Sequence, residues 1–204
     1  MDVDTQVDFI STSGAFGQQI AQWNVPRIVP NLARLARYAE KQKLTTILAT
    51  DAHVPDDPEF SGPIPPHCVV GTPGHRRVPE TDLSPTIVIE NRAHDLVLPL
   101  PDTKRLVVKA HKQHFAVGSN PNFSPLMKEL APHHVFTSGV ATQGCVMASI
   151  KSLLELGIPV SIVVDAVGPD IYEEPGRLAI KELTSLGVTA LTTDEVCTGT
   201  LLAR

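Results

Sequence analysis

The sequence predicts a three-layer α/β fold, in which a mostly parallel sheet lies between two layers of helices. Apolar strand-like runs alternate along the chain with segments of helical periodicity, the pattern that produces a parallel sheet covered on both faces. The 204 residues suffice for one compact domain and are few for two. No repeat, low-complexity tract or linker divides the chain. We therefore expect a single domain over residues 1–204.

Each expected element follows from a local pattern. Strands are expected at short apolar runs, in a stub at 2–3 and over 45–50, 86–89, 106–108, 135–140, 160–164 and 188–191. Helices are expected where apolar residues recur at spacings of three and four, over 28–42, 143–156 and 174–186, with a short helix at the end. Two long stretches, 52–85 and 109–124, show no clear element, and long loops in a compact domain are usually functional.

Composition excludes several classes of protein. The chain has 17 basic against 22 acidic residues, a formal charge of −5, so it lacks the basic excess of nucleic-acid or membrane-surface proteins. No apolar run approaches the roughly 20 residues of a membrane helix. Three cysteines form no disulfide framework, and Met1 is not followed by a signal-peptide pattern. We expect a cytoplasmic protein without nucleic-acid or membrane partners.

The segment after strand 45–50 contains a candidate metal site. Asp51 and His53 are two residues apart, so in an extended segment their side chains point the same way. His67 follows two prolines that stiffen its approach, and Glu59 in the same loop is a further candidate ligand. Asp, His and His suit Zn²⁺, Mn²⁺ or Fe²⁺. The alternative is two unrelated loop histidines beside a turn aspartate.

Cys145 is the candidate nucleophile. It follows strand 135–140 and a glycine-containing turn, and it falls in the first turn of the next predicted helix, with Thr142 as the expected N-cap. A helix N-terminus lowers a thiol pKa, and its free N–H groups can hold an oxyanion. The alternative is an inert buried cysteine. Cys68 and Cys197 lack this setting.

Two further polar clusters follow predicted strands. The segment 4–9 contains Asp4 and Asp8, and the segment 109–115 contains Lys109 and Lys112. A carboxylate there could act as a base, and a lysine beside a thiol would favour the thiolate. The spacing does not show which of the two aspartates, or which of the two lysines, would take part. The competing interpretations are a surface turn for the segment 4–9 and a solvated loop for the segment 109–115. Each cluster comes from a different strand end, as one pocket in this fold would require.

These motifs together resemble those of the isochorismatase-like cysteine hydrolases, and within them those of the nicotinamidase/pyrazinamidase group. The similarity follows the family's order over most of the chain. The stretch Pro-His-Cys-Val-x-Gly-Thr-Pro-Gly at 66–74 is its most specific part. The matching segments are 3–9, 50–53, 65–74, 112–115, 120–122 and 139–146.

The resemblance implies a fold and a set of roles. The fold would be the isochorismatase-like hydrolase fold, with a six-stranded parallel sheet flanked by helices. The resemblance selects Asp4, Lys112 and Cys145 as the catalytic triad and assigns a divalent metal to Asp51, His53 and His67. It also implies a cis peptide at Val140–Ala141, which would aim the N–H groups of Ala141 and Cys145 at an oxyanion. A small amide would be cleaved through a thioester on the cysteine.

The sequence also departs from the nicotinamidase pattern. Ile64 stands where an aromatic wall residue is common, Gly144 where Tyr or His usually precedes the nucleophile, and Glu59 where some members have another His ligand. Phe9 and Phe115 are left to line a ring pocket. The first strand is short for the family, so we expect a few of its residues to be missing ahead of Met1.

Nicotinamide is the substrate that these motifs favour, and three competing functions remain. The first is that of a sibling amidase for a carbamoyl or ureido compound, although such siblings commonly lack the metal. The second is that of an isochorismatase proper, a vinyl-ether hydrolase that does not need the cysteine. The third is that of a non-catalytic binding relative. Family members often assemble, so a homo-oligomer is a further expectation.

Overall fold

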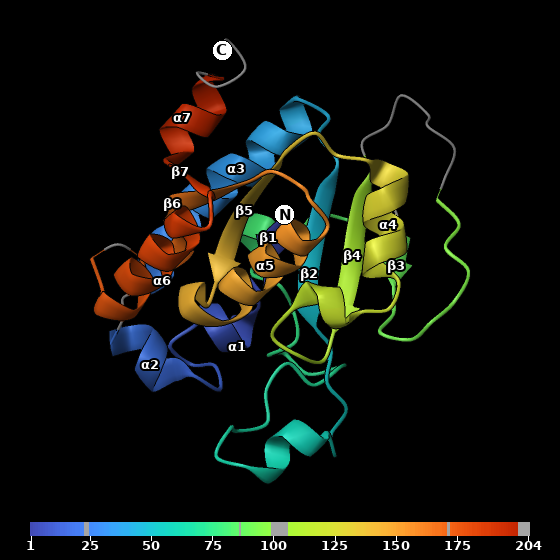
Figure 1. The fold of residues 1–204 in the computed structure, drawn as a ribbon. Helices are drawn as coiled ribbons and strands as arrows, with labels where there is room; N and C mark the ends of the chain where they lie inside the picture. The colour runs from blue at the N-terminus through green and yellow to red at the C-terminus, as the bar shows by residue number, and fades with distance from the viewer. Residues whose placement is uncertain (23–24, 86, 99–105, 171, 200–204) are drawn as a thin grey trace.

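A seven-stranded parallel sheet forms the centre of the protein (Figure 1). The computed structural model describes residues 1–22, 25–85, 87–98, 106–170 and 172–199. The strand order is β3-β4-β2-β1-β5-β6-β7, one strand more than the six expected, and both edge strands have only three residues. The strands are β1 (Asp2–Val3), β2 (Thr46–Asp51), β3 (Ile87–Ile89), β4 (Val107–Lys112), β5 (Val135–Val140), β6 (Val160–Gly168) and β7 (Thr189–Leu191).

Helices cover both faces of this sheet. Figure 1 shows α4 (Phe123–Leu130), α5 (Met147–Glu155) and α6 (Glu174–Ser185) over one face, and α3 (Val29–Lys41) and α7 (Thr193–Thr198) over the other. Two short helices, α1 (Val7–Ile10) and α2 (Gly17–Gln22), lie in the segment after β1. A π-helical turn, Thr142–Val146, leads into α5. Within the described residues, no helix is long and apolar enough to cross a bilayer.

The predicted elements are present, with differences at their ends. All seven strand-like segments and the four helices are found, so the three-layer α/β prediction is confirmed. The patterns missed α1, α2 and α4, which have four, six and eight residues and are too short for a clear period of 3.6. Strand β4 also continues to Lys112, into a segment expected to be a loop. The strand was predicted from its apolar run, and the polar residues in its second half interrupt that run.

The order of the strands determines where on the sheet a ligand site is expected. β1 pairs with β2 on one side and with β5 on the other, so the direction of strand order reverses at β1. Parallel sheets bind ligands beyond the carboxyl ends of their strands at such a reversal. Gly139 makes the close approach of β5 to β1 possible, because it has φ of +115° and an added Cβ would lie 2.0 Å from the carbonyl oxygen of Val3.

The core consists of two apolar layers, one on each face of the sheet. Leu126, Ile150 and Leu183 from the three helices of one layer are completely buried against it. On the other face, Ile28 and Leu32 pack with Val163 and Val196. Burial of this kind on both faces makes the sheet a rigid platform, so the loops at its carboxyl edge are held at fixed positions.

Candidate active site

Three buried side chains from separate strand ends meet at the carboxyl edge of the sheet. Asp4 directly follows β1, Lys112 is the last residue of β4, and Cys145 lies in the π-helical turn after β5. Asp4 and Lys112 are completely buried and Cys145 is nearly so. The Asp4 backbone has a positive φ of 50°, a left-handed conformation that is uncommon for a residue other than glycine. These are the three residues that the resemblance selected as a triad.

The ammonium group of Lys112 contacts two buried carboxylates. Its ammonium nitrogen lies 2.7 Å from Oδ2 of Asp4 and donates a hydrogen bond to Oδ1 of Asp51. Ligand atoms of Asp4, Asp51 and Cys145 all lie within 4.8 Å of one another. One ammonium is therefore enclosed with two carboxylates and a thiol, and removing it would leave the carboxylates buried without a counter-ion.

The environment shifts the proton affinities of all three groups. Burial, followed by the charge of Asp51, raises the pKa of Asp4 to about 7, although Lys112 opposes the shift. Burial also raises the pKa of the Cys145 thiol well above its ordinary value, again against the effect of Lys112. Burial opposes the charged form of Lys112, but Asp4 and Asp51 outweigh it and raise the lysine pKa. We expected a helix N-terminus to lower the pKa of this thiol. The pKa is raised instead, because the effect of burial is the larger one.

The structure separates the candidates that spacing left open. The carboxylate of Asp8 binds backbone groups: its Oδ2 accepts from the N–H of Cys68 at 2.8 Å and its Oδ1 accepts from the N–H of Ala15 at 2.9 Å. Lys109 lies three residues before Lys112 on β4 and is only half-buried. Asp4 and Lys112 are therefore the pair that faces Cys145.

A second cluster, of Asp51, His53 and His67, adjoins the first. Nε2 of His53 and Nε2 of His67 each lie 3.8 Å from Oδ2 of Asp51, and all three side chains are buried. Asp51 ends β2, so the cluster occupies the same edge of the sheet. Together the three residues form a candidate metal-binding group.

The groups behind the two histidines support metal binding. Nδ1 of His67 lies 2.9 Å from the carbonyl oxygen of Pro65, and Nδ1 of His53 lies 3.0 Å from Oδ2 of Asp57. A carbonyl can only accept, so Nδ1 of His67 carries the proton and Nε2 turns a lone pair toward the Asp51 carboxylate. Lone pairs that converge in this way suit a cation, and carboxylates or carbonyls behind metal-bound histidines are the usual arrangement.

Glu59 lies at the border of the metal cluster. Its Oε2 is 4.0 Å from Nε2 of His53, and the side chain is partly exposed. Ligand atoms of His53, Asp57 and Glu59 also lie within 4.8 Å of one another. Glu59 is thus placed where it could approach a metal, while Asp57, which we had not selected, orients His53.

Gln6 is a site residue that the sequence reasoning missed. Its side-chain nitrogen donates to the carbonyl oxygens of Asp51 and His75, both at 2.9 Å, and its oxygen accepts from the N–H of Asp51 at 2.8 Å. A completely buried glutamine with these bonds fixes the end of β2, and with it the Asp51 carboxylate. The sequence signal that could have identified Gln6 is its position two residues after Asp4.

The turn before Cys145 has the expected cis peptide at Val140–Ala141. The N–H groups of Gly144 and Val146 both donate to the carbonyl oxygen of Ala141, at 2.9 and 3.1 Å. The prediction that Thr142 caps the helix is wrong. Its hydroxyl instead donates to the carbonyl oxygen of Pro169, and so ties the turn to the end of β6.

An apolar cavity of about 400 Å³ opens beside this turn. Phe9, Phe115 and Gly144 line it, whereas Ile64 is not among its lining residues. Phe16, which we had not selected, also lines it and stacks on Phe9 at a centroid distance of 5.3 Å. Val140 and Ala141 complete the wall of the cavity, in the turn that leads to Cys145.

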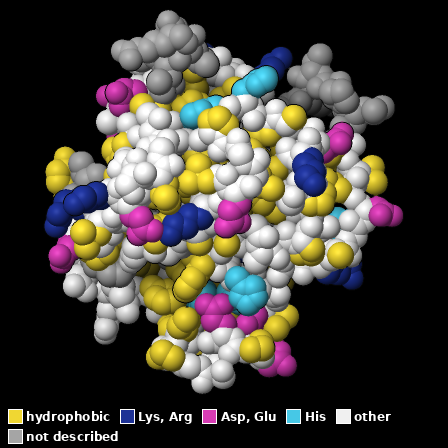
Figure 2. Space-filling view, in the orientation of Figure 1, with side chains coloured by type: hydrophobic (Ala, Val, Ile, Leu, Met, Phe, Trp, Pro, Cys, Tyr) yellow, Lys and Arg dark blue, Asp and Glu magenta, His cyan; other side chains and the backbone are white. Residues whose placement is uncertain are grey.

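Aromatic rings connect this cavity to the metal cluster. The imidazole of His67 lies 5.2 Å from the rings of both Phe9 and Phe16, and 5.4 Å from that of Phe60. Figure 2 shows histidine and acidic side chains gathered with hydrophobic ones at the bottom of the view, over the loops at the carboxyl edge of the sheet. His114, two residues after Lys112, is exposed at this edge.

Comparison with known families identifies the fold that holds this site. The isochorismatase domain model matches residues 3–195. The chain belongs to the isochorismatase family. No curated protein matches its sequence, whereas many solved structures share its fold.

Similar solved structures include different amidases of this family. A pyrazinamidase/nicotinamidase from Streptococcus mutans UA159 is 21% identical with a TM-score of 0.73, over 93% of this chain and 97% of that one. A pyrazinamidase from Pyrococcus horikoshii in complex with zinc is 24% identical with a TM-score of 0.67, over 94% and 97%. An N-carbamoylsarcosine amidase from Thermoplasma acidophilum is 19% identical with a TM-score of 0.70, over 95% of each chain. At these identities the similarity establishes the fold of the family and leaves the substrate open.

Proposed function

We propose that this chain is a metal-dependent cysteine amidohydrolase that converts nicotinamide to nicotinate and ammonia. The observation that carries the proposal is the buried contact of Asp4, Lys112 and Cys145 beside an apolar cavity. A nucleophile needs a base within reach and a third group that stabilises the charge, and these three residues supply both. The adjoining cluster of Asp51, His53 and His67 would bind the metal.

The first step is the attack of the thiol on the amide. Asp4, with a pKa of about 7, is ionised in a large fraction of molecules at neutral pH and takes the proton of Cys145. Lys112 stabilises the thiolate through its charge. The sulfur then forms a bond to the amide carbon, and the resulting oxyanion is held by backbone N–H groups of Ala141 and Cys145 in the turn.

The second step releases ammonia. The proton on Asp4 passes to the amide nitrogen as the carbon–nitrogen bond breaks, which leaves a thioester on Cys145. Asp4 next takes a proton from water as the water oxygen attacks the thioester carbon. The carbon–sulfur bond breaks, the sulfur recovers the proton, and the product is a carboxylic acid.

A divalent metal would be held by Asp51, His53 and His67, with Glu59 nearby. When bound, it would supply a positive centre for an electron-pair donor of the substrate, such as a ring nitrogen. Asp57 and the Pro65 carbonyl keep the two imidazoles turned toward that centre.

The cavity favours a neutral ring over an acidic chain. Among the described residues that line it there is no charged side chain, and the rings of Phe9, Phe16 and Phe115 provide apolar surface. A substrate carboxylate placed here would lose hydration without a cationic partner. The pocket therefore supports nicotinamide over N-carbamoyl or ureido acids.

A vinyl-ether hydrolase and a non-catalytic binding protein fit the geometry less well. A vinyl-ether hydrolase would not need the thiol, yet Cys145 lies beside Asp4, which contacts Lys112. A non-catalytic relative would have no reason to keep two carboxylates and an ammonium buried together, an arrangement that generally costs stability.

The test is ammonia release from a panel of nicotinamide, pyrazinamide, an N-carbamoyl amino acid, a ureido acid and biuret, with Cys145→Ala as the control enzyme. We expect the highest kcat/KM for nicotinamide and no reaction with the variant. A ureido or carbamoyl acid that reacts as fast as nicotinamide would contradict the proposed substrate. Full activity of Cys145→Ala would contradict the mechanism.

A further inference from the structure

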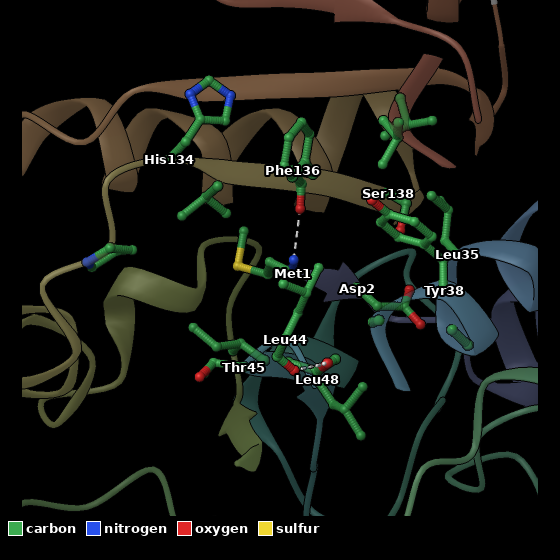
Figure 3. A pocket seen from close by; sticks show the side chains of 18 of the residues that line it. Met1, Asp2, Leu35, Tyr38, Leu44, Thr45, Leu48, His134, Phe136 and Ser138 are labelled. Atoms are coloured by element: carbon green, nitrogen blue, oxygen red, sulfur yellow. Dashed lines mark hydrogen bonds between the residues drawn. The ribbon is translucent and has the colours of Figure 1, made fainter. Parts of the chain in front are cut away.

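The cavity beside the turn of Cys145 is the one that can present an amide to the thiol. Another cavity, of about 420 Å³, surrounds Met1 and Phe136 at the amino edge of the sheet (Figure 3). Phe136 lies near the start of β5 and Cys145 after its end, so a ligand bound there is a strand length away from the nucleophile. The inference below concerns the cavity of about 400 Å³ at the carboxyl edge, which we call the ring cavity.

The ring cavity is larger than a nicotinamide molecule. One six-membered ring with a carboxamide fills roughly 150 Å³, about the share of five water molecules in the liquid. The cavity measures about 400 Å³, and cavities of roughly 300–1,000 Å³ take ligands of drug size. A substrate that fills it therefore has more surface than nicotinamide.

The spare room adjoins Gly144, the residue directly before the nucleophile. Gly144 lines the cavity, and a Cβ built on it would have one neighbour among the described residues within 4 Å, beyond its own chain neighbours. That neighbour is Cβ of Ala141 at 3.9 Å, and Ala141 also lines the cavity. The open volume beside Gly144 is therefore part of the cavity, and any side chain at position 144 would project into it.

The cavity is closed at its other glycine. Gly168 of β6 is paired with Val140 of β5, and a Cβ built on Gly168 would lie 3.3–3.4 Å from side-chain carbons of Val25, Ile28 and Val140. These three side chains are nearly fully buried and belong to one apolar cluster. Extra groups of a substrate consequently have room beside Gly144 and none beside Gly168.

The lining residues determine the chemistry of such an extra group. Among the described ones, Gln19 and Gln143 are the polar side chains and none is charged. An ionic group would lose its hydration here without a partner of opposite charge. A hydrocarbon group would instead gain affinity from the apolar surface that it buries.

We propose that this site takes ring carboxamides that carry an apolar substituent on the ring, and that Gly144 is the residue that admits the substituent. The inference rests on the proposed amidase function and extends its substrate class beyond nicotinamide itself. The ring would lie among Phe9, Phe16 and Phe115, with its carboxamide at Cys145 and its substituent in the open volume beside Gly144.

The experiment measures binding in a chain that cannot react. The Cys145→Ala chain, with zinc added, is titrated by calorimetry with nicotinamide and with nicotinamides that carry a propyl group at ring carbon 4, 5 or 6. We expect at least one propyl compound to bind about tenfold or more tightly than nicotinamide, since each buried methylene contributes roughly fourfold in affinity. If none of the three binds more tightly than nicotinamide, the proposal is overturned.

Variants at Gly144 make the test specific. Added to Cys145→Ala, Gly144→Ala should reduce the gain of the propyl compound over nicotinamide, and Gly144→Leu should remove it. Gly62→Leu is the matched control and should keep the gain, because a Cβ at Gly62 also meets no atom within 4 Å but Gly62 does not line the cavity. A gain that survives both Gly144 variants would overturn the proposal, and Gly144→Ala decides if the leucine variant does not fold.

The result can be separated from that of the proposed function. Ammonia release tests the function in the unmodified chain, whereas calorimetry tests the cavity. Hydrolysis of nicotinamide without any gain in affinity for the propyl compounds would support the function and contradict the inference. A gain that depends on Gly144, without hydrolysis of any amide, would support the assignment of the cavity and contradict the function.

Discussion

Asp51 and Lys112 lie directly opposite one another at the ends of the adjacent strands β2 and β4. Oδ1 of Asp51 accepts a hydrogen bond from Lys112, while Oδ2 faces the imidazoles of His53 and His67. One carboxylate thus joins the cluster of Asp4, Lys112 and Cys145 to the candidate metal-binding group. Because burial would raise the pKa of Asp51, but Lys112 and His53 together lower it, the carboxylate stays ionised.

Replacing Lys112 should damage both stability and activity. Lys112→Met leaves Asp4 and Asp51 buried without their counter-ion, so we expect the free energy of unfolding to fall by about 3–5 kcal/mol. Hydrolysis should be lost as well, because nothing then stabilises the thiolate. Urea unfolding and ammonia release measure the two effects. The matched control is Lys109→Met on the same strand, which should lose far less, and equal losses for the two variants would contradict the assignment.

Removing the thiol should abolish hydrolysis without unfolding the protein. Cys145→Ala loses the nucleophile, and we expect kcat to fall by more than about 10⁴-fold, as happens when a covalent nucleophile is deleted. Cys197→Ala is the control, since Cys197 lies on α7 outside the site. Loss of activity in the Cys197 variant, or its retention in the Cys145 variant, would refute the assignment.

The carboxylate behind His53 should affect metal affinity. Asp57→Ala removes the group that holds Nδ1 of His53, so we expect zinc affinity to fall by about 10- to 100-fold. Competition with a chromophoric chelator measures the change. Asp56→Ala, at the exposed neighbouring position, is the control and should bind zinc like the unmodified protein. If both variants bind zinc equally well, Asp57 does not orient a ligand.

Activity should depend on pH through Asp4. The carboxylate must be ionised to take the thiol proton, and its pKa is raised to about 7. We therefore expect kcat/KM to fall about tenfold for each pH unit below 7, and to level off above it. Steady-state rates between pH 5 and 8.5 test this, with Asp4→Asn as the inactive control. A profile that is flat across this range would show that Asp4 is not the base.

The aromatic wall should act on substrate binding. Phe16→Ala removes a ring that contacts both Phe9 and His67, so we expect KM for nicotinamide to rise by up to about tenfold, in line with roughly 0.5–1.5 kcal/mol for a lost aromatic contact. Phe136→Ala, at the opposite end of the sheet, is the control and should leave KM unchanged. Equal KM values for both variants would exclude Phe16 from the pocket.

The sequence was sufficient for the fold class, and it named most of the residues that the structure brings together at the carboxyl edge of the sheet. Alternating strand and helix patterns predict the three-layer architecture because the period of apolar residues reflects which face of each element is buried. The motifs around Asp4, His67 and Cys145 are local. Asp4 and Cys145 follow neighbouring strands of one parallel sheet, and the long loop after β2 brings His67 back to the same edge. Helices α1, α2 and α4 escaped prediction, since their four to eight residues show no clear period.

Only the tertiary structure decided what depends on contacts between distant segments. Asp8 and Asp4 look alike in the sequence, yet one bonds to the backbone of Cys68 while the other is enclosed with Lys112. The raised pKa of the Cys145 thiol reverses the effect expected from its helix, because burial is a property of the whole fold. The contacts of Gln6, Phe16 and Asp57 likewise arise from packing between strands and loops that lie far apart along the chain.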